Sequence, residues 1–265
     1  MELGLRARAC IVTGASRGIG RATAIGLAAE GASVLLLGRT ERSLEEVARA
    51  CDDAGGRPET LVLDIGAPDA GARAVSECLE RFGRIDVLVN NAGSSSVRTL
   101  EQLTDADWQE QWELNVMVPM RLMRDAAPAM ARGGWGRIVN VSSSSGKRPG
   151  KRNMAYSVTK AAELSLSRSF ADLYASAGVL VNAVAPGPVG TDLWLAPGGL
   201  ADQTADAQGI SRERAIATTA GGVPLGRLGG DQEIASVIVF LCSEAASYVT
   251  GAAWSVDGGI VQTIV

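Results

Sequence analysis

The chain has 265 residues, of which 46% are hydrophobic and 20% are charged, and its formal net charge is -4. This is the composition of an ordinary globular protein, and the length allows one large α/β domain with a substantial core. Because the charge is slightly negative and no run of Lys or Arg forms a basic stripe, neither nucleic acid nor an anionic membrane is an expected partner.

Short apolar runs alternate with longer amphipathic segments through the first two thirds of the chain. Strands are predicted at 9–13, 33–37, 59–63, 86–90, 137–141 and 179–184, and helices at 19–30, 41–54, 67–82, 105–131 and 154–177. The strands are almost wholly apolar, which is typical of strands covered on both faces. The repeated βαβαβ order predicts an α/β fold with a Rossmann-like, doubly wound parallel sheet of about seven strands and helices on both faces, formed by residues 1–265 as a single domain.

The segment 191–222 breaks this alternation. It is rich in Gly, Ala and Asp, and it is too long for a plain connection, so we expect a mobile substrate lid with some helix. A helix at 232–243 and a strand at 252–256 complete the fold. No stretch approaches the roughly 18 to 20 unbroken apolar residues of a membrane span, and no apolar signal-peptide core lies in the first ten residues. We therefore expect a cytoplasmic protein without a membrane partner.

Two residue types restrict the chemistry. The sequence contains no histidine, which excludes His-based triads, His general bases and His metal ligands. The four cysteines show no Cys-x-x-Cys spacing, so buried free thiols are expected instead of a disulfide or a metal site. Acid-base chemistry must therefore use Tyr, Lys, Asp, Glu, Cys or water.

A glycine-rich turn lies between the first strand and the first helix. Glycines there permit a tight turn and a close approach of the backbone to a pyrophosphate, and the helix N-terminus adds unpaired N–H groups. The turn predicts dinucleotide binding by Gly14, Ser16, Arg17, Gly18, Ile19 and Gly20. The alternative is a turn that only packs the helix on the strand.

The end of the second strand indicates which dinucleotide binds. An NAD-binding unit places an acidic residue there, on the ribose 2′-hydroxyl, whereas this chain has Gly38 and Arg39. Arg39 and Arg17 together suit a 2′-phosphate, so NADPH is the expected cofactor; the alternative is a merely solvated Arg39. Asp64, followed by Ile65, closes the third strand, where it could bind the adenine amino group or form a simple turn.

Unusual residues follow several other strands. Asn90, Asn91, Ala92 and Gly93 follow the fourth strand, Ser142 to Ser145 follow the fifth, and Pro186, Gly187 and Pro188 follow the sixth. Because the carboxyl ends of parallel strands share one edge of the sheet, we expect these residues to converge on a ligand site.

Tyr156 and Lys160 are four residues apart at the start of a predicted helix, so their side chains share one face. A free tyrosine has a pKa of about 10, but an ammonium at about 4 Å supplies about 4 kcal/mol toward a phenolate. The pair could therefore act as an acid-base group. In the preceding predicted helix, Pro119 lacks an N–H for the carbonyl of Asn115, which predicts a kink and an acceptor for water; a plain kink is the alternative.

The chain resembles the short-chain dehydrogenase/reductase family over essentially its full length, in the single-domain branch similar to ketoacyl-carrier-protein reductases. The matching residues are Thr13-Gly14-x-x-x-Gly18-Ile19-Gly20, Asn90-Asn91-Ala92-Gly93, Asn115, Ser143, Tyr156-x-x-x-Lys160, Pro186-Gly187 with Thr191, and Val256-Asp257-Gly258-Gly259. The resemblance implies hydride transfer by a tetrad of Asn115, Ser143, Tyr156 and Lys160, with Ser142 and Ser144 as alternatives to Ser143. It also implies that Val189 and Thr191 hold the nicotinamide, that Tyr156 and Lys160 contact the cofactor, and that the protein is a homotetramer.

These observations predict an NADPH-dependent enzyme that reversibly reduces a ketone to a secondary alcohol. The substrate is expected to contact Ser95, Ser145, Met154 and Trp194 in a largely apolar pocket, and a hydrophobic ketone or a β-ketoacyl thioester both fit that description. Two alternatives are an NAD-linked alcohol dehydrogenase of the same fold and a nucleotide-binding protein without catalysis. The three unaltered residues Ser143, Tyr156 and Lys160 argue against the second.

Overall fold

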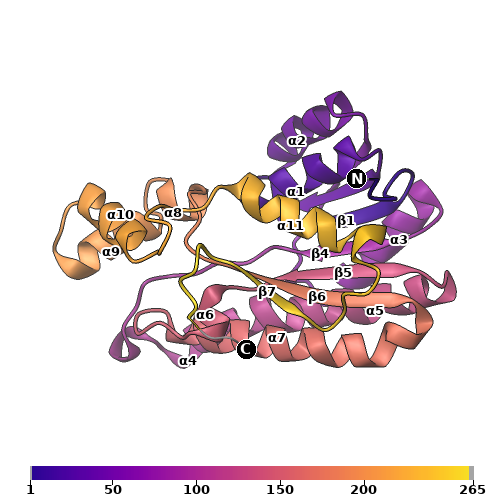
Figure 1. The fold of residues 1–265 in the computed structure, drawn as a ribbon. Helices are drawn as coiled ribbons and strands as arrows, with labels where there is room; N and C mark the ends of the chain where they lie inside the picture. The colour runs from indigo at the N-terminus through magenta and orange to yellow at the C-terminus, as the bar shows by residue number, and fades with distance from the viewer. Residues whose placement is uncertain (1, 263–265) are drawn as a thin grey trace.

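The computed structural model describes residues 2–262, which form a seven-stranded parallel sheet (Figure 1). The strands are β1 Ala9–Thr13, β2 Ser33–Gly38, β3 Arg57–Val62, β4 Val87–Asn90, β5 Gly136–Val141, β6 Val179–Pro186 and β7 Ala253–Val256. Their order in the sheet is β3-β2-β1-β4-β5-β6-β7, and all neighbours are parallel. The predicted doubly wound sheet is confirmed, and the strand order changes direction between β1 and β4.

Helices cover both faces of the sheet, as its apolar strands require. One layer contains α1 Gly18–Ala29, α2 Glu41–Asp53 and α11 Asp231–Leu241; the other contains α3 Ala70–Phe82, α5 Val118–Arg132 and α7 Met154–Tyr174 (Figure 1). Alternate residues of β1 enter separate cores: Cys10 and Val12 face the first layer, whereas Ala9 and Ile11 face the second.

The predicted helix at 105–131 is divided into three parts. The α-helix α4, Asp105–Trp112, leads into a π-helical segment, Glu113–Met117, which is followed by α5. Pro119 lies in the first turn of α5 and has no N–H for the carbonyl of Asn115, so a normal helical bond cannot form there. The predicted disturbance at Asn115 is therefore present as a π-helical turn.

Several other boundaries differ from the prediction by one to three residues. The helix expected at 67–82 begins only at Ala70, because residues 64–69 form turns, one of which is closed by the Asp64 carboxylate accepting from the Gly66 N–H at 3.0 Å. The strand expected at 59–63 begins at Arg57. Short helices fill the remaining loops: η1 Leu100–Gln102, α6 Ser144–Lys147, η3 Ala175–Ala177 and η4 Glu244–Ala246.

The segment 191–222 forms three short helices, α8 Asp192–Leu195, α9 Leu200–Gln208 and α10 Arg212–Gly221. They extend from one side of the sheet as a separate lobe (Figure 1). Small apolar residues such as Ala201 and Ala215 are buried where α9 and α10 pack together. Gln203 accepts a hydrogen bond from the Val97 N–H at 2.9 Å, which connects this lobe to the loop after β4.

The four cysteines are free and buried, as predicted. Burial raises the pKa of the Cys51 thiol to about 11 and those of Cys78 and Cys242 to about 12, and it also raises the pKa of Cys10. Between residues 2 and 262, no group of three or more Cys, Asp or Glu side chains is arranged to hold a metal ion. No helix in that range is long and apolar enough to cross a bilayer.

We expect the thiols to be almost inert in the native protein. A raised pKa lowers the thiolate fraction at neutral pH, and the thiolate is the reactive species. An aromatic disulfide reagent should therefore modify the native chain slowly and modify all four thiols after denaturation. Rapid labelling of the native chain would contradict the buried positions of these side chains.

Candidate active site

The turn between β1 and α1 is held in a conformation that requires glycine. Gly14 and Gly18 have φ values of +62° and +53°, which strain most residues that carry a Cβ. A Cβ on Gly20 would lie 2.3 Å from the Gly14 carbonyl oxygen. Arg17, the N-cap residue of α1, makes no side-chain capping bond, so the first N–H groups of the helix remain available to an anion.

The end of β4 holds this turn in place. The Asn91 side-chain amide donates to the carbonyls of Thr13 at 2.9 Å and Gly14 at 3.2 Å. In return, the Thr13 hydroxyl accepts from the N–H groups of Asn91 at 2.9 Å and Ala92 at 3.0 Å. Asn91 thus supports the turn with its side chain. The role of Thr13 was not predicted, because a threonine at the end of a strand carries no distinctive sequence signal.

The residues that follow β6 lie against the turn between β1 and α1. Thr191 begins α8, and its methyl group lies 3.2 Å from the position that a Cβ on Gly18 would occupy. Val189 is fixed by a bridge to Gly229, and Gly187 packs against Asp257, where a Cβ would lie 2.8 Å from the Asp257 Cα. The structure therefore brings the predicted residues after β1, β4 and β6 together.

Arg17 and Arg39 are exposed, and neither forms an ion pair with another described residue. Arg39 follows β2, and no acidic residue stands at the end of that strand. Asp64 is exposed, and its carboxylate closes a local turn. Ile65, next to it, packs against the second core.

Ser143 follows β5 and is the N-cap residue of α6, which packs against α7. Its hydroxyl oxygen accepts from the Ser145 N–H at 3.1 Å, so its own hydrogen is free to be donated. The neighbouring Ser142 hydroxyl donates to the Lys160 carbonyl at 2.9 Å. A Cβ on Gly146 would lie 2.8 Å from that carbonyl, so glycine permits the close contact. These contacts fix Ser143 beside the first turns of α7, which carry Tyr156 and Lys160.

The Lys160 ammonium is buried beneath Tyr156, with its nitrogen 5.9 Å from the ring centroid. It donates to the Val141 carbonyl and to a Glu163 carboxylate oxygen, both at 2.8 Å. Burial lowers the pKa of Lys160, but the charges of Glu163 and Tyr156 and the hydrogen bond that Lys160 donates to Glu163 outweigh it, so the net shift is upward. The lysine is therefore held protonated.

Asn115 approaches Lys160 from the π-helical segment. Its amide nitrogen donates to Gln111 at 3.0 Å and to Thr159 at 3.2 Å, while its buried side-chain oxygen has no hydrogen-bond partner among the described residues. That oxygen and the Lys160 nitrogen lie 3.3 and 3.7 Å from the position of a Cβ on Gly93. An unsatisfied acceptor beside a buried ammonium suits a water molecule or a ligand hydroxyl.

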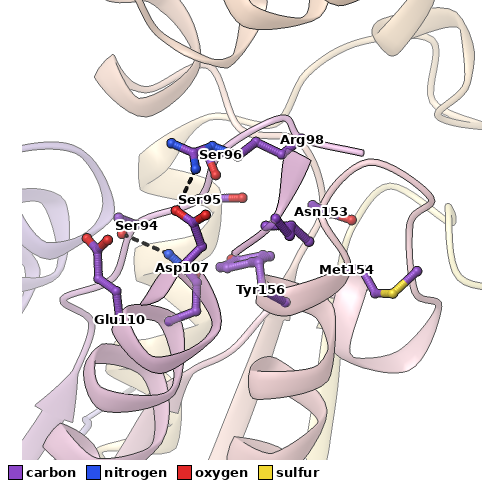
Figure 2. Close-up of a pocket in the computed structure, with 12 residues that line it drawn as sticks. Ser94, Ser95, Ser96, Arg98, Asp107, Glu110, Asn153, Met154 and Tyr156 are labelled. Atoms are coloured by element: carbon purple, nitrogen blue, oxygen red, sulfur yellow. Dashed lines mark hydrogen bonds and ion pairs between the residues drawn. The ribbon is translucent and has the colours of Figure 1, made fainter. Parts of the chain in front are cut away.

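A cavity of about 150 Å³ opens beside Tyr156 (Figure 2). Its lining consists of Ser94, Ser95, Ser96, Arg98, Leu103, Asp107, Glu110, Gln111, Asn153, Met154, Ala155 and Tyr156. Figure 2 shows Tyr156 between the side chains of α4 and Asn153, with an ion pair joining Arg98 to Asp107. Most of the lining residues are polar, so the expectation of a largely apolar pocket was wrong.

The predicted substrate residues are only partly in this lining. Ser95 and Met154 line the cavity. Ser145 lies just behind it and accepts a hydrogen bond from the Asn153 amide at 3.1 Å. Trp194 is half-buried in α8 and is not part of the lining. The carboxylates and amides of α4 were not predicted, because polar residues on one side of a helix look like a solvated surface.

The chain is similar to known proteins over nearly its whole length. The family described as enoyl-(acyl carrier protein) reductase matches residues 14–261. The chain is 38% identical to the short-chain reductase protein NovJ of Streptomyces niveus, over 94% of this chain and 92% of that protein. It is 34% identical to the 3-oxoacyl-[acyl-carrier-protein] reductase FabG of Thermotoga maritima, over 97% and 99%.

Among solved structures, L-sorbose reductase from Gluconobacter frateurii, complexed with NADPH and L-sorbose, superposes with a TM-score of 0.92. It is 34% identical to this chain, and the match covers 100% of both chains. A gluconate 5-dehydrogenase of Beutenbergia cavernae, described from a structure with bound NADP, superposes with a TM-score of 0.87 at 36% identity, over 99% of this chain and 100% of that one.

Gly20→Ala should open the turn after β1. The added methyl group meets the backbone of Gly14 and the Asn91 amide, so overpacking should cost about 1–3 kcal/mol of unfolding free energy and weaken dinucleotide binding. Chemical denaturation and a fluorescence titration with NADPH measure the two effects. Gly221→Ala is the matched control, because an added Cβ there has nothing within 4 Å; equal behaviour of the two variants would contradict the assignment.

Proposed function

Since the chain belongs to the short-chain dehydrogenase/reductase family, we propose that it is an NADPH-dependent carbonyl reductase that converts a ketone reversibly to a secondary alcohol. The main support is the grouping of three side chains: Tyr156 lines the cavity, the buried Lys160 ammonium lies 5.9 Å from the centroid of the Tyr156 ring, and Ser143 precedes α6, which packs against α7. Asn115 completes the group with its unpartnered side-chain oxygen.

The side chains divide the chemistry between them. NADPH, when bound, supplies the hydride. Ser143 donates a hydrogen bond to the substrate carbonyl oxygen, because its own oxygen is already engaged by the Ser145 N–H. Tyr156 gives its phenolic proton to the same oxygen as negative charge develops there. Lys160 stabilises the resulting phenolate with its ammonium charge, which acts strongly in a buried site.

The turn after β1 fits a dinucleotide pyrophosphate. Close backbone approach is possible at Gly14, Gly18 and Gly20, and the uncapped N-terminus of α1 offers N–H donors and positive charge. Ser16 and Ile19 lie in the same turn. We propose that Asp64, Ile65, Ala92, Gly93, Pro186, Gly187, Val189 and Thr191 line the remainder of the cofactor site.

Two observations favour NADPH over NADH. Arg17 and Arg39 are exposed and have no acidic partner in the described part of the chain, and two guanidinium groups suit a 2′-phosphate. In addition, the similar L-sorbose reductase was solved with NADPH. An NAD-linked alcohol dehydrogenase would need an acidic residue at the end of β2, and none is there.

The polar cavity favours a small, hydroxylated ketone. Ser94 to Ser96, Gln111 and Asn153 offer hydrogen bonds, and Asp107 and Glu110 add acceptors for substrate hydroxyl groups. A purely apolar ketone would leave these groups without partners, at a cost of about 1–3 kcal/mol for each buried one. L-sorbose, the ligand of the similar reductase, belongs to this class.

Three further features are part of this proposal. Residues 191–222 act as a substrate lid, because Gln203 of α9 binds the loop that carries Ser94 to Ser96. The whole chain works as one domain, since both cores are built on the same sheet. A homotetramer in the cytoplasm is the expected working state of the protein.

A panel of ketones tests the proposal directly. NADPH and NADH oxidation is followed by absorbance with sugar-like ketones, apolar ketones and a β-ketoacyl thioester. NADPH turnover on hydroxylated ketones is the expected result. Faster turnover of the β-ketoacyl thioester would contradict the proposal of a hydroxylated ketone and indicate an acyl thioester as the substrate. Binding of NADPH without turnover of any ketone would favour a non-catalytic nucleotide-binding protein.

Tyr156→Phe should lower kcat/KM by a factor of about 10² to 10⁴, the usual contribution of general acid-base catalysis. The phenyl ring keeps the shape of the site, so NADPH should bind with unchanged affinity in a fluorescence titration. Tyr248→Phe serves as the control, because that side chain is fully exposed. Retained turnover in Tyr156→Phe would reject Tyr156 as the acid.

Arg39→Asp combined with Arg17→Ser should shift the cofactor preference toward NADH. The change removes two cations and restores the acid that binds a ribose 2′-hydroxyl, so the ratio of kcat/KM for NADPH to that for NADH should fall at least about tenfold. Arg42→Ser, in the exposed first turn of α2, should leave the ratio unchanged. An unaltered preference in the double variant would overturn the cofactor assignment.

A further inference from the structure

A second buried charge lies directly behind the proposed catalytic lysine. Glu163 is one helical turn after Lys160 in α7, and both side chains are 3% exposed. One carboxylate oxygen of Glu163 lies 2.8 Å from the Lys160 nitrogen. Glutamate is almost never fully buried without a partner, and an apolar residue would fill this core position at less cost.

We propose that Glu163 is a positioning residue for the reaction: it is the buried counter-charge that keeps Lys160 protonated and holds the ammonium beneath Tyr156. This inference rests on the proposed function, because it assigns Glu163 a role through Lys160. The geometry supports this positioning role, because the Glu163 carboxylate and the Val141 carbonyl accept hydrogen bonds from two of the three N–H donors of the Lys160 ammonium. One donor remains for a ligand hydroxyl.

The environment of Glu163 contains no competing cation among the described residues. Ser167 donates to its backbone carbonyl at 2.7 Å. Burial raises the pKa of Glu163, and the nearby Lys160 charge opposes this rise. The Lys160–Glu163 contact is therefore the ionic interaction that compensates both groups.

Few other charges act on Lys160. The groups that shift its pKa are Glu163 and Tyr156, both on α7. From β5 it meets the uncharged Val141 carbonyl and Ser142, and from the π-helical segment the uncharged Asn115. Three ionisable groups on the neighbouring elements are engaged elsewhere: Arg121 of α5 with Glu113, Lys147 of α6 with the Ala253 carbonyl, and Asp107 of α4 with Arg98.

Removing the carboxylate charge should therefore make Lys160 lose its proton more easily. Burial by itself lowers the pKa of a lysine, and a fully buried lysine can become neutral near physiological pH. A neutral Lys160 supplies no charge to stabilise the phenolate of Tyr156. In the direction of alcohol oxidation, activity should then decline at a lower pH in Glu163→Gln than in the wild type.

The chain offers a direct measurement of this effect. It contains three lysines, Lys147, Lys151 and Lys160, so lysine labelled with ¹³C at the ε carbon gives three side-chain signals, which Lys147→Arg and Lys151→Arg assign. In Glu163→Gln, Lys160 should titrate at least about one pH unit lower than in the wild type, while the other two lysines stay unchanged. An unshifted Lys160 would overturn the proposal.

Two further variants separate a charge effect from a structural one. Ser167→Ala removes the hydrogen bond to the Glu163 carbonyl and leaves the charge, so its lysine titration and pH profile should match the wild type; a shift equal to that of Glu163→Gln would indicate a packing effect and overturn the proposal. Glu163→Asp keeps the charge at a longer distance and should restore part of the pH profile. If Glu163→Gln does not fold, Glu163→Asp carries the titration test with a smaller shift in the same direction.

The titration needs no substrate, so it stands apart from the proposed function. If the wild type reduces no ketone, the proposed function fails, while the lysine titration still decides whether Glu163 keeps Lys160 protonated. If the wild type is active and the pH profile of Glu163→Gln superposes on it, the positioning role fails and the proposed function stands.

Discussion

The parallel pairing of β4 with β1 on one side and β5 on the other determines where every functional group lies. This pairing ends the three strands at one edge, so the glycine turn, Gly93 and Ser143 become neighbours although they are far apart in the chain. The contacts between Thr13 and Asn91 then hold the turn after β1 to the end of β4. Without that pairing, the glycines would form an ordinary tight turn.

In the π-helical segment, one residue without an N–H changes the geometry of the candidate active site. Pro119 cannot donate to the Asn115 carbonyl, so the helix widens. The Asn115 side chain is then held by Gln111 and Thr159 with its oxygen unsatisfied. Helix packing against α7 turns this local defect into an acceptor near the Lys160 ammonium.

A ladder of polar side chains supports the site from the core. Asn90 donates to Asn140 at 2.7 Å, Asn140 donates to Ser167 at 2.7 Å, and Ser167 donates to the carbonyl of Glu163. Each member is buried, and a buried polar group is costly when it is left without a partner. The ladder therefore stabilises the packing of α7 against β5.

The sequence by itself determined the features that depend on local backbone chemistry or on regular spacing. Apolar runs predicted the parallel strands, glycines predicted the turn after β1, Pro119 predicted the disturbance at Asn115, and the four-residue spacing predicted a shared face for Tyr156 and Lys160. Each follows from steric limits or from helical periodicity within a few residues.

Only the tertiary structure decided which polar groups face one another. In the sequence, nothing distinguishes Asp107 and Glu110 from a solvated helix face or Glu163 from an ordinary helical glutamate. The tertiary structure places Asp107 and Glu110 in the cavity beside Tyr156 and buries Glu163 against Lys160. The physical reason is that burial depends on how different elements pack together. Sequence spacing specifies that Glu163 and Lys160 share one face of α7, but it does not specify that neighbouring elements bury that face.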